Sequence, residues 1–300
     1  MEPKTIAPTE RIHSRAYDAI LPTRPQLSQA GKTVLVTAGT AGIAYTIARN
    51  FALAGANMVI LTGRVPDKVN AAVDALIKEV KTIDAKSQTK IEGRVCQIAE
   101  SASIGALFED FAKDHVHIDV LVLSAAQIVP GKLTDQDWEG VWKQFVVNVR
   151  ATHQFRDLFE KQTKVGTGPR YIVNVSTSAI HHFTNGMEMG SYTLTKTAAA
   201  LALQQIADET DPSKTQIINF HPGTILGLQA KEYGMTADSA NWDHEDLPGS
   251  FAVWAASPEA TFLHGRFVWA GWDVNELQSG PVREKLDKDS SFLKIGVNGL

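Results

Sequence analysis

The sequence predicts an α/β fold in which helices cover both faces of a parallel sheet. Between residues 33 and 269, short apolar runs alternate with segments of helical pattern, and such alternation is typical of right-handed β-α-β crossovers. The chain has 300 residues, of which 44% are hydrophobic, so it has enough apolar material for a large core. Because no linker interrupts the alternation, we expect residues 1–300 to form a single domain.

Each expected strand is a short apolar run, and a helical pattern follows it. The strands are expected at residues 33–37, 57–62, 91–96, 118–124, 171–176, 216–220 and 265–269. The helices are expected at residues 43–54, 67–81, 101–114, 135–161, 191–208 and 251–257. Residues 1–30 are polar and contain several prolines, which predicts an irregular N-terminal arm. Residues 228–246 are expected to form a loop or lid over the substrate, and residues 274–300 a mixed tail.

The composition excludes several classes of protein. A net charge of -4 gives the chain no basic surface for nucleic acid or for an anionic membrane. No apolar run approaches the ~18 residues of a membrane span, and the N-terminus lacks the apolar core of a secretory signal. The single cysteine, Cys96, predicts a buried thiol in a reducing compartment and no internal disulfide. With no His, Cys, Asp and Glu cluster at metal-ligand spacing, we expect a cytoplasmic protein without a catalytic metal.

Small residues follow the first expected strand and open the first expected helix. In a parallel sheet, ligands bind beyond the carboxyl ends of the strands. A small-residue turn there lets the backbone approach a pyrophosphate, while the helix N-terminus supplies N–H groups and a positive dipole end. The expected cofactor contacts in this turn are Thr37, Gly39, Thr40, Gly42 and Ile43. The alternative is a turn that is small only for tight packing.

Arg64 follows the second expected strand, where the adenosine ribose of a bound dinucleotide would lie. An acidic residue at that place would bind a ribose 2′-hydroxyl, whereas a guanidinium suits a 2′-phosphate. Arg64 therefore favours NADP(H) over NAD(H). The alternative is an arginine that is only exposed to solvent.

Tyr192 and Lys196 are four residues apart in the helical segment 191–208, so a helix places both on one face. A phenol with a pKa near ~10 is a poor acid–base catalyst at neutral pH. A nearby ammonium favours the phenolate, so we expect Lys196 to lower the pKa of Tyr192. The alternative is a half-buried tyrosine beside a solvated lysine.

Over about residues 30–272, the chain resembles the short-chain dehydrogenase/reductase family. The motifs that carry the resemblance are the turn from Thr37 to Ala44, Asn148 in the long expected helix, the strand at residues 172–176, the Tyr192/Lys196 pair and Pro222-Gly223. The resemblance implies a Rossmann-type doubly wound parallel sheet and a homodimer or homotetramer. Residues 22–28 and 262–274 are similar to a fungal branch of the family, many of whose members act in secondary metabolism.

The resemblance also implies roles for individual residues. Thr177 has the register of the family's catalytic hydroxyl, and Ser178, one residue closer to Tyr192, is a near-equal candidate. Asn148 would hold a water that links Lys196 to solvent, and Lys196 would grip the nicotinamide ribose. The other implied cofactor contacts are Gln97 at the adenine, Ala125, Tyr192, Pro222, Gly223 and Ile225.

Several departures from the family's pattern affect the expected cofactor site. Ala38 and Ala44 replace glycines, so we expect the backbone to keep a negative φ there and to stand slightly farther from the cofactor. Residues 123–126, Leu-Ser-Ala-Ala, replace Asn-Asn-Ala-Gly and remove amides that brace neighbouring strands. Gly227 stands where a threonine would contact the nicotinamide.

The predicted function is NADP(H)-dependent reduction of a small-molecule ketone or aldehyde, or oxidation of the alcohol. Tyr192 would donate a proton to the developing alkoxide, and Thr177 or Ser178 would stabilise its charge. One alternative is a non-redox isomerase, dehydratase or cyclase that uses the same Tyr192/Lys196 pair. Another is a binding protein, which the intact pair disfavours. The histidines at 181–182 are expected to line the substrate pocket or to be exposed.

Overall fold

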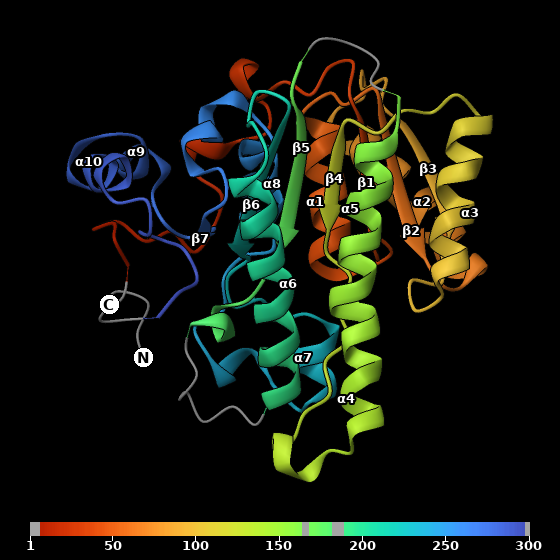
Figure 1. Cartoon of the computed structure of the whole chain (residues 1–300). Coiled ribbons are helices and arrows are strands. Elements are labelled where there is room, and N and C mark those ends of the chain that lie inside the picture. Colours follow the sequence, from red (N-terminus) through yellow and green to blue (C-terminus); the bar gives the residue numbers. More distant parts are fainter. Residues whose placement is uncertain (1–6, 164–167, 182–188, 298–300) are drawn as a thin grey trace.

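The computed structural model (Figure 1) describes residues 7–163, 168–181 and 189–297, and its centre is one parallel sheet of seven strands. The strands are β1 Thr33–Val36, β2 Met58–Gly63, β3 Lys90–Val95, β4 Val120–Leu123, β5 Arg170–Val175, β6 Thr215–His221 and β7 Phe267–Trp269. They lie in the order β3-β2-β1-β4-β5-β6-β7. Every predicted strand is present, and the predicted Rossmann-type doubly wound sheet is confirmed.

The strand order reverses beside β1. One edge of β1 pairs with β2 and the other with β4, so that Val34 lies between Val59 and Val120. The chain adds β2 and β3 on one side of β1 and then returns to add β4 on the other. Ligands of open α/β sheets bind at such a reversal, beyond the carboxyl ends of the strands, so a dinucleotide is expected at this edge.

Helices cover both faces of the sheet. They are α1 Gly42–Leu53, α2 Pro66–Ile83, α3 Ser101–Lys113, α4 Trp138–Phe145, α5 Ala151–Lys161, α6 Gly190–Asp208, α7 Leu228–Glu232, α8 Asp246–Ala255, α9 Val274–Gln278 and α10 Gly280–Lys288. Side chains of α1, α2 and α8 pack into the core on one face, and those of α3, α5 and α6 pack on the other. In Figure 1, α5 and α6 stand in front of the sheet and α1 lies behind it.

The strands are apolar throughout because both of their faces are buried. Val34 and Val36 belong to the core on the side of α1 and α8, whereas Leu35 between them belongs to the core on the side of α3 and α5. All three side chains are fully buried. Since alternate residues of a strand point to opposite faces, a central parallel strand needs a continuous apolar run rather than an alternating one.

Helix α8 begins at Asp246, although the sequence predicted its start at residue 251. Pro248 lies in the first turn of the helix, where a proline needs no hydrogen bond from its nitrogen. Gly249 has a packing role, because a Cβ there would collide with the Asn50 side chain of α1. Helix α8 therefore crosses close to the helix that follows the first strand.

The long helix predicted at residues 135–161 begins at Trp138 and contains a π turn. Asp137 caps its start by accepting a hydrogen bond from Gly140 N at 2.6 Å. Helix α4 passes into the π turn Val146–Arg150, and α5 then continues to Lys161 as predicted. Single π turns within α-helices are frequent at functional sites, and this one carries Asn148.

Residues 7–30 are irregular, as predicted, but they are packed into the core. Ile20 and Leu27 lie in two short 3₁₀ turns and have no exposed surface. Arg24 forms an ion pair with Glu259 at 3.0 Å. The arm is therefore part of the folded structure and fastens the segment that follows α8.

The segment predicted as a loop or lid, residues 228–246, is mostly irregular but begins with the short helix α7. The predicted mixed tail contains α9 and α10. Figure 1 shows α4 and α7 extending past the carboxyl ends of the strands. Both helices therefore lie at the edge where the ligand is expected.

Cys96 has 1% of its surface exposed, which confirms the predicted buried thiol. Burial also raises the pKa of this thiol. Among the helices in the described ranges, none is both long and apolar enough to cross a bilayer.

Candidate functional site

The turn between β1 and α1 leaves the start of the helix open. Helix α1 begins after Ala41, whose side chain makes no capping hydrogen bond, and its first turn carries no acidic residue. Gly42 has a φ of +60°, and no atom lies within 4 Å of the position that a Cβ would take. Thr40 and Ile43 on either side are half-buried. The first N–H groups of the helix and its positive dipole end therefore suit an anion such as a pyrophosphate.

Gly39 and Gly63, by contrast, are small because the turn packs tightly against β2. A Cβ at Gly39 would lie 2.8 Å from Leu61 Cδ2, and a Cβ at Gly63 would lie 2.6 Å from Thr40 Cγ2. The Gly39 N–H also donates to the Thr62 carbonyl at 2.9 Å. Because the Gly39 N–H already donates to Thr62 O, it is not available to a ligand. Tight packing against β2 therefore accounts for the small residue at Gly39.

Ala38 has a φ of +55°, so the prediction that the backbone keeps a negative φ there is wrong. The turn bends back toward β2 at this point, where the Ala38 N–H donates to Thr62 Oγ1 at 3.2 Å. A left-handed backbone costs a non-glycine residue about 1 kcal/mol. Ala44 differs, because it lies within α1 and keeps the expected negative φ.

We expect Ala38→Gly to raise the free energy of unfolding by about 0.5–1 kcal/mol, because glycine adopts a positive φ without a Cβ clash. Ala85→Gly is the control, since Ala85 lies in an exposed turn outside any helix terminus cap and its φ is not positive. Glycine there should lower the stability by about 0.5 kcal/mol through the entropy of the unfolded chain. Denaturant unfolding measures both variants, and equal losses of stability in the two would contradict a strained turn at Ala38.

Thr37 joins the end of β1 to the loop after β4. Its hydroxyl donates to Val122 O at 3.2 Å and accepts from Ser124 N at 2.8 Å and from Ala125 N at 3.1 Å. This is the loop in which the family's side-chain amides are missing. The hydrogen bonds of the Thr37 hydroxyl therefore connect β1 to the end of β4, in place of the bonds that those amides would make.

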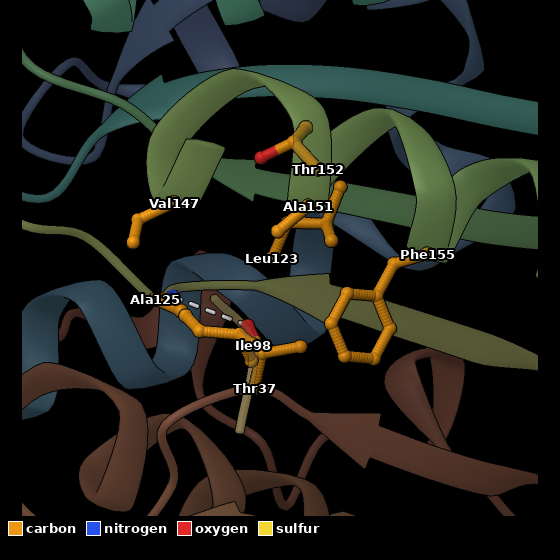
Figure 2. A pocket seen from close by; sticks show the side chains of 8 residues that line it. All are labelled: Thr37, Ile98, Leu123, Ala125, Val147, Ala151, Thr152 and Phe155. Atoms are coloured by element: carbon orange, nitrogen blue, oxygen red, sulfur yellow. Dashed lines mark hydrogen bonds between the residues drawn. The ribbon is translucent and has the colours of Figure 1, made fainter. Parts of the chain in front are cut away.

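A small cavity lies between this loop and α5 (Figure 2). Its volume is about 10 Å³, and its lining residues are Thr37, Ile98, Leu123, Ala125, Val147, Ala151, Thr152 and Phe155. A cavity of this size holds at most about one water molecule. On this side of the loop, Thr37 and Ala125 thus face a closely packed interior rather than a space for a ligand.

Arg64 and Gln97 lie together at the carboxyl ends of β2 and β3. The side-chain amide of Gln97 donates to Arg64 O at 3.1 Å, and its backbone N–H donates to Ser103 Oγ at 2.9 Å. Arg64 is exposed, and within the described ranges its guanidinium has no hydrogen bond or ion pair. This side chain is therefore available to an anionic ligand beside the turn.

Tyr192, Lys196 and Thr177 meet where α6 begins, next to the end of β5. The Thr177 side chain lies close enough to the Tyr192 hydroxyl to lower its pKa. Lys196 is 3% exposed, and its Nζ donates to Val175 O at 2.7 Å. Because the lysine is buried and bonded to the backbone, the alternative of a solvated lysine beside the tyrosine does not hold.

Burial sets the pKa of each member of this pair. It raises the pKa of Tyr192 to about 12, against the opposing effect of the Thr177 hydrogen bond, and it lowers the pKa of Lys196 to about 8. The prediction that Lys196 lowers the pKa of Tyr192 is therefore wrong for the chain by itself. Since the amine is directed at the Val175 carbonyl, the loss of water around the phenol outweighs the attraction of the ammonium for a phenolate.

The turn after β5 distinguishes the two candidate hydroxyls. Thr177 lies close enough to Tyr192 to lower the pKa of its phenol, whereas Ser178 opens a 3₁₀ turn and its backbone N–H donates to His221 Nδ1 at 3.2 Å. The geometry thus favours Thr177. His221 was not among the predicted site residues, although its place directly before Pro222 was an available signal.

Of the histidine pair, the structure describes His181, while His182 lies outside the described residues. The His181 ring accepts a hydrogen bond from Trp269 Nε1 at 3.1 Å and packs edge-on against Phe267 at 5.3 Å between ring centroids. His181 is therefore exposed but held against the aromatic side chains of β7.

Asn148 is 1% exposed and uses its side-chain amide within the protein. Its Oδ1 accepts from Gln127 N at 2.7 Å. Its Nδ2 donates to Gln127 O at 2.9 Å and to Thr195 Oγ1 at 3.0 Å. The π turn thereby ties the loop after β4 to α6, at the residue that precedes Lys196.

The loop after β6 is held by a residue that the sequence analysis missed. Thr224 N donates to Asp243 Oδ2 at 2.7 Å, and Asp243 N donates to Thr224 O at 2.8 Å. Beside this contact, Gly223 has a φ of +97°, Pro222 is buried and Ile225 is half-buried. Asp243 lies in the segment after α7 that has no periodic pattern, so nothing in the sequence signalled its contact.

Comparison with known proteins gives a consistent family. The family model for short chain dehydrogenase matches residues 32–234. The short chain dehydrogenase/reductase AacuD of Aspergillus aculeatus is 32% identical, over 97% of this chain and 97% of its own length. The short chain dehydrogenase/reductase nsrO of Aspergillus novofumigatus is 32% identical, over 97% of this chain and 96% of its own. These relatives confirm the resemblance to fungal members.

Solved structures give the same fold. A short-chain type dehydrogenase/reductase from Mycobacterium ulcerans has a TM-score of 0.70 at 22% identity, covering 87% of this chain and 98% of that one. The RhlG/NADP complex of Pseudomonas aeruginosa has a TM-score of 0.71 at 17% identity, covering 82% of this chain and 97% of that one. With the doubly wound sheet, the turn after β1 and the family match over residues 32–234, the chain belongs to the short-chain dehydrogenase/reductase family.

Proposed function

We propose that this enzyme reduces a ketone or aldehyde with NADP(H), or oxidises the corresponding alcohol. The observation that carries the proposal is the buried Lys196, which bonds to Val175 O at the end of β5 and lies one helical turn from Tyr192, with Thr177 close enough to lower the pKa of that phenol. These groups lie beyond the carboxyl end of β5, the edge of the sheet where the family's cofactor is expected.

The bound dinucleotide supplies a hydride, and the chain's own residues supply the proton and the charge stabilisation. Because burial raises the pKa of Tyr192 to about 12, the phenol is protonated at neutral pH and can donate to the substrate oxygen as negative charge develops there. Thr177 donates a hydrogen bond to the same oxygen. Lys196 brings a positive charge close to the site below pH 8. A protonated phenol suits reduction better than oxidation.

The residues of the chain fit a phosphorylated dinucleotide. The open N-terminus of α1 and Gly42 suit the pyrophosphate, Arg64 suits a 2′-phosphate, and Gln97 lies beside Arg64 where the adenine is expected. The Pseudomonas aeruginosa protein of the same fold contains NADP. We therefore propose NADP(H) as the cofactor.

A non-redox isomerase, dehydratase or cyclase is the second candidate, because the Gly39 amide is used by Thr62 and Ala38 adds a methyl to the turn. Fluorescence titration with NADPH and NADH, followed by NADPH absorbance with a panel of ketones and aldehydes, separates the candidates. We expect NADPH binding and a carbonyl-dependent loss of absorbance. Absence of cofactor binding would refute the oxidoreductase, and conversion of a substrate without NADPH oxidation would favour the second candidate.

We expect Arg64→Ala to weaken NADPH binding about 10–100-fold and to leave NADH binding within about twofold, because a charge-assisted contact to a phosphate contributes roughly 1.5–3 kcal/mol. Arg15→Ala, which removes an exposed arginine of the N-terminal arm, is the matched control and should change neither. The dissociation constants come from the same fluorescence titration. Equal losses of affinity for NADPH and NADH would show that Arg64 does not bind the 2′-phosphate.

We also propose a homodimer or homotetramer formed through α4 and α6. Trp138 is 72% exposed and Trp142 60% exposed on α4, and Leu194 and Leu201 are exposed on α6. Large exposed apolar side chains gathered on neighbouring elements are typical of protein interfaces. Sedimentation velocity measures the oligomeric state, and a monomer at micromolar concentration would refute this proposal.

A further inference from the structure

The loop after β6 is clasped by Asp243 through two hydrogen bonds. The carboxylate accepts from Thr224 N at 2.7 Å, and the backbone N–H of Asp243 donates to Thr224 O at 2.8 Å. The two residues are 19 positions apart. Asp243 also lies beyond residue 234, where the match to the family model ends. The clasp is thus made by a part of the chain that the family model does not cover.

The carboxylate lies directly against the backbone of Gly223. A Cβ at Gly223 would lie 2.7 Å from Asp243 Oδ2 and 3.2 Å from its Cγ. Gly223 also has a φ of +97°, which favours glycine. Both the conformation and the absence of a side chain at Gly223 are therefore needed for Asp243 to reach Thr224.

The segment that carries Asp243 is anchored on its other side. His244 N donates to Ser14 O of the N-terminal arm at 2.6 Å. Asp246 forms an ion pair with Arg49 of α1, which is 9% exposed. The clasp is therefore attached to the same helix whose N-terminus suits the pyrophosphate, and the loop after β6 is held relative to that helix.

Burial affects the carboxylate as well. It raises the pKa of Asp243, and the hydrogen bond from Thr224 acts in the opposite direction. Thr224 itself is exposed, so what distinguishes the contact is its geometry: two hydrogen bonds join Asp243 and Thr224, and the carboxylate fits against the bare Cα of Gly223.

We propose that Asp243 is a positioning residue that fixes Gly223 and Thr224 in the conformation that receives the nicotinamide end of the cofactor. This inference rests on the proposed function and on the family resemblance, which implies that Pro222, Gly223 and Ile225 contact the cofactor. Gly227 lacks the nicotinamide contact that the family's threonine would make at its place. By fixing the loop, Asp243 compensates for part of this lost contact. The affinity for NADPH then depends on a carboxylate that does not itself belong to the pyrophosphate turn.

The test compares three variants with the unmodified chain. Asp243→Ala removes the acceptor, whereas Asp243→Asn keeps an oxygen of the same reach without the charge. Asp211→Ala is the matched control, because Asp211 also accepts a backbone N–H, from Ser213 at 2.8 Å, in the loop before β6 at the opposite edge of the sheet. The readouts are hydrogen exchange over residues 222–227 without cofactor, the NADPH dissociation constant and the unfolding midpoint.

We expect Asp243→Ala to speed exchange at Thr224 at least about tenfold and to weaken NADPH binding about tenfold, as expected for a lost hydrogen bond to a charged group. Asp243→Asn should stay within about threefold of the unmodified chain in both, and Asp211→Ala should change neither. If Asp243→Ala does not fold, Asp243→Ser replaces it, because a serine hydroxyl is too short to reach Thr224 N.

Two outcomes would overturn the inference. One is unchanged exchange at Thr224 in Asp243→Ala, and the other is faster exchange with an unchanged affinity for NADPH. If the unmodified chain binds neither NADPH nor NADH, the proposed function fails and the positioning role fails with it, whereas the exchange data still decide whether Asp243 holds the loop.

Discussion

Tyr192→Phe is expected to lower kcat for carbonyl reduction by about 10²–10⁴-fold, the usual contribution of a general acid. The variant removes one hydroxyl, which lies close to the Thr177 side chain, and keeps the aromatic ring in the first turn of α6. The NADPH dissociation constant should therefore stay within about threefold and the unfolding midpoint within a few degrees. Steady-state kinetics, fluorescence titration and thermal unfolding measure the three quantities.

Tyr45→Phe is the matched control for this change. It also removes a phenol hydroxyl, which donates to Glu79 at 3.0 Å on the far side of α1, and it should leave kcat within about twofold. Retention of more than a tenth of the activity in Tyr192→Phe would remove Tyr192 from the chemistry. Loss of NADPH binding in that variant would instead indicate that the phenol acts in cofactor binding.

Lys196→Met is expected to have the second-largest effect, with a loss of about 100-fold or more in kcat/KM. The methionine fills a similar volume but removes the positive charge beside Tyr192 and the donor to Val175 O. A charge fixed in a site with little water stabilises a developing negative charge strongly. The same measurements as for Tyr192 apply, and an unchanged kcat/KM would show that the amine has no part in the reaction.

The pH dependence of stability gives Lys196→Met a second readout. Burial lowers the pKa of Lys196 from 10.5 to about 8, so between these values the unfolded chain binds more protons than the folded one. The free energy of unfolding contributed by Lys196 therefore rises with pH from about 8 to about 10.5, by up to about 3 kcal/mol. Lys196→Met should lack this rise, which chemical denaturation at pH 7 to 10.5 measures.

Lys32→Met is the matched control. Burial lowers the pKa of Lys32 to about 8 as well, but Lys32 directly precedes β1, at the edge of the sheet opposite the site. This variant should lose its own part of the pH-dependent stability and keep its kcat/KM. A loss of activity in both variants would mean that the effect of Lys196→Met reflects general damage to the fold.

The sequence predicts the fold well because local patterns decide it. The apolar runs of the central strands satisfy burial on both faces, as Val34 and Leu35 show. The predicted start of α8 at residue 251 is wrong because residues 246–250, with Pro248 and Gly249, have no helical pattern of their own, whereas close contact with α1 is set by the tertiary structure.

The site is predicted less completely. Spacing places Tyr192 and Lys196 on one helical face, but it does not reveal that the amine would bond to Val175 of another element or that burial would dominate both pKa values. The sign of φ at Ala38 depends on contacts with Thr62 in β2. Asp243 reaches Thr224 across 19 residues with no pattern between them.

The packing of the N-terminal arm predicts what happens when the arm is removed from the protein. The turn that carries Ile20 packs against α8 and α9, and Ile20 and Leu27 have no exposed surface. A truncated protein that started at residue 32, where the match to the family model begins, would expose these apolar contacts of the arm to water. The match to the family model therefore begins at a later residue than the folded unit does, and the arm belongs with the domain, as its coverage by the fungal relatives also indicates.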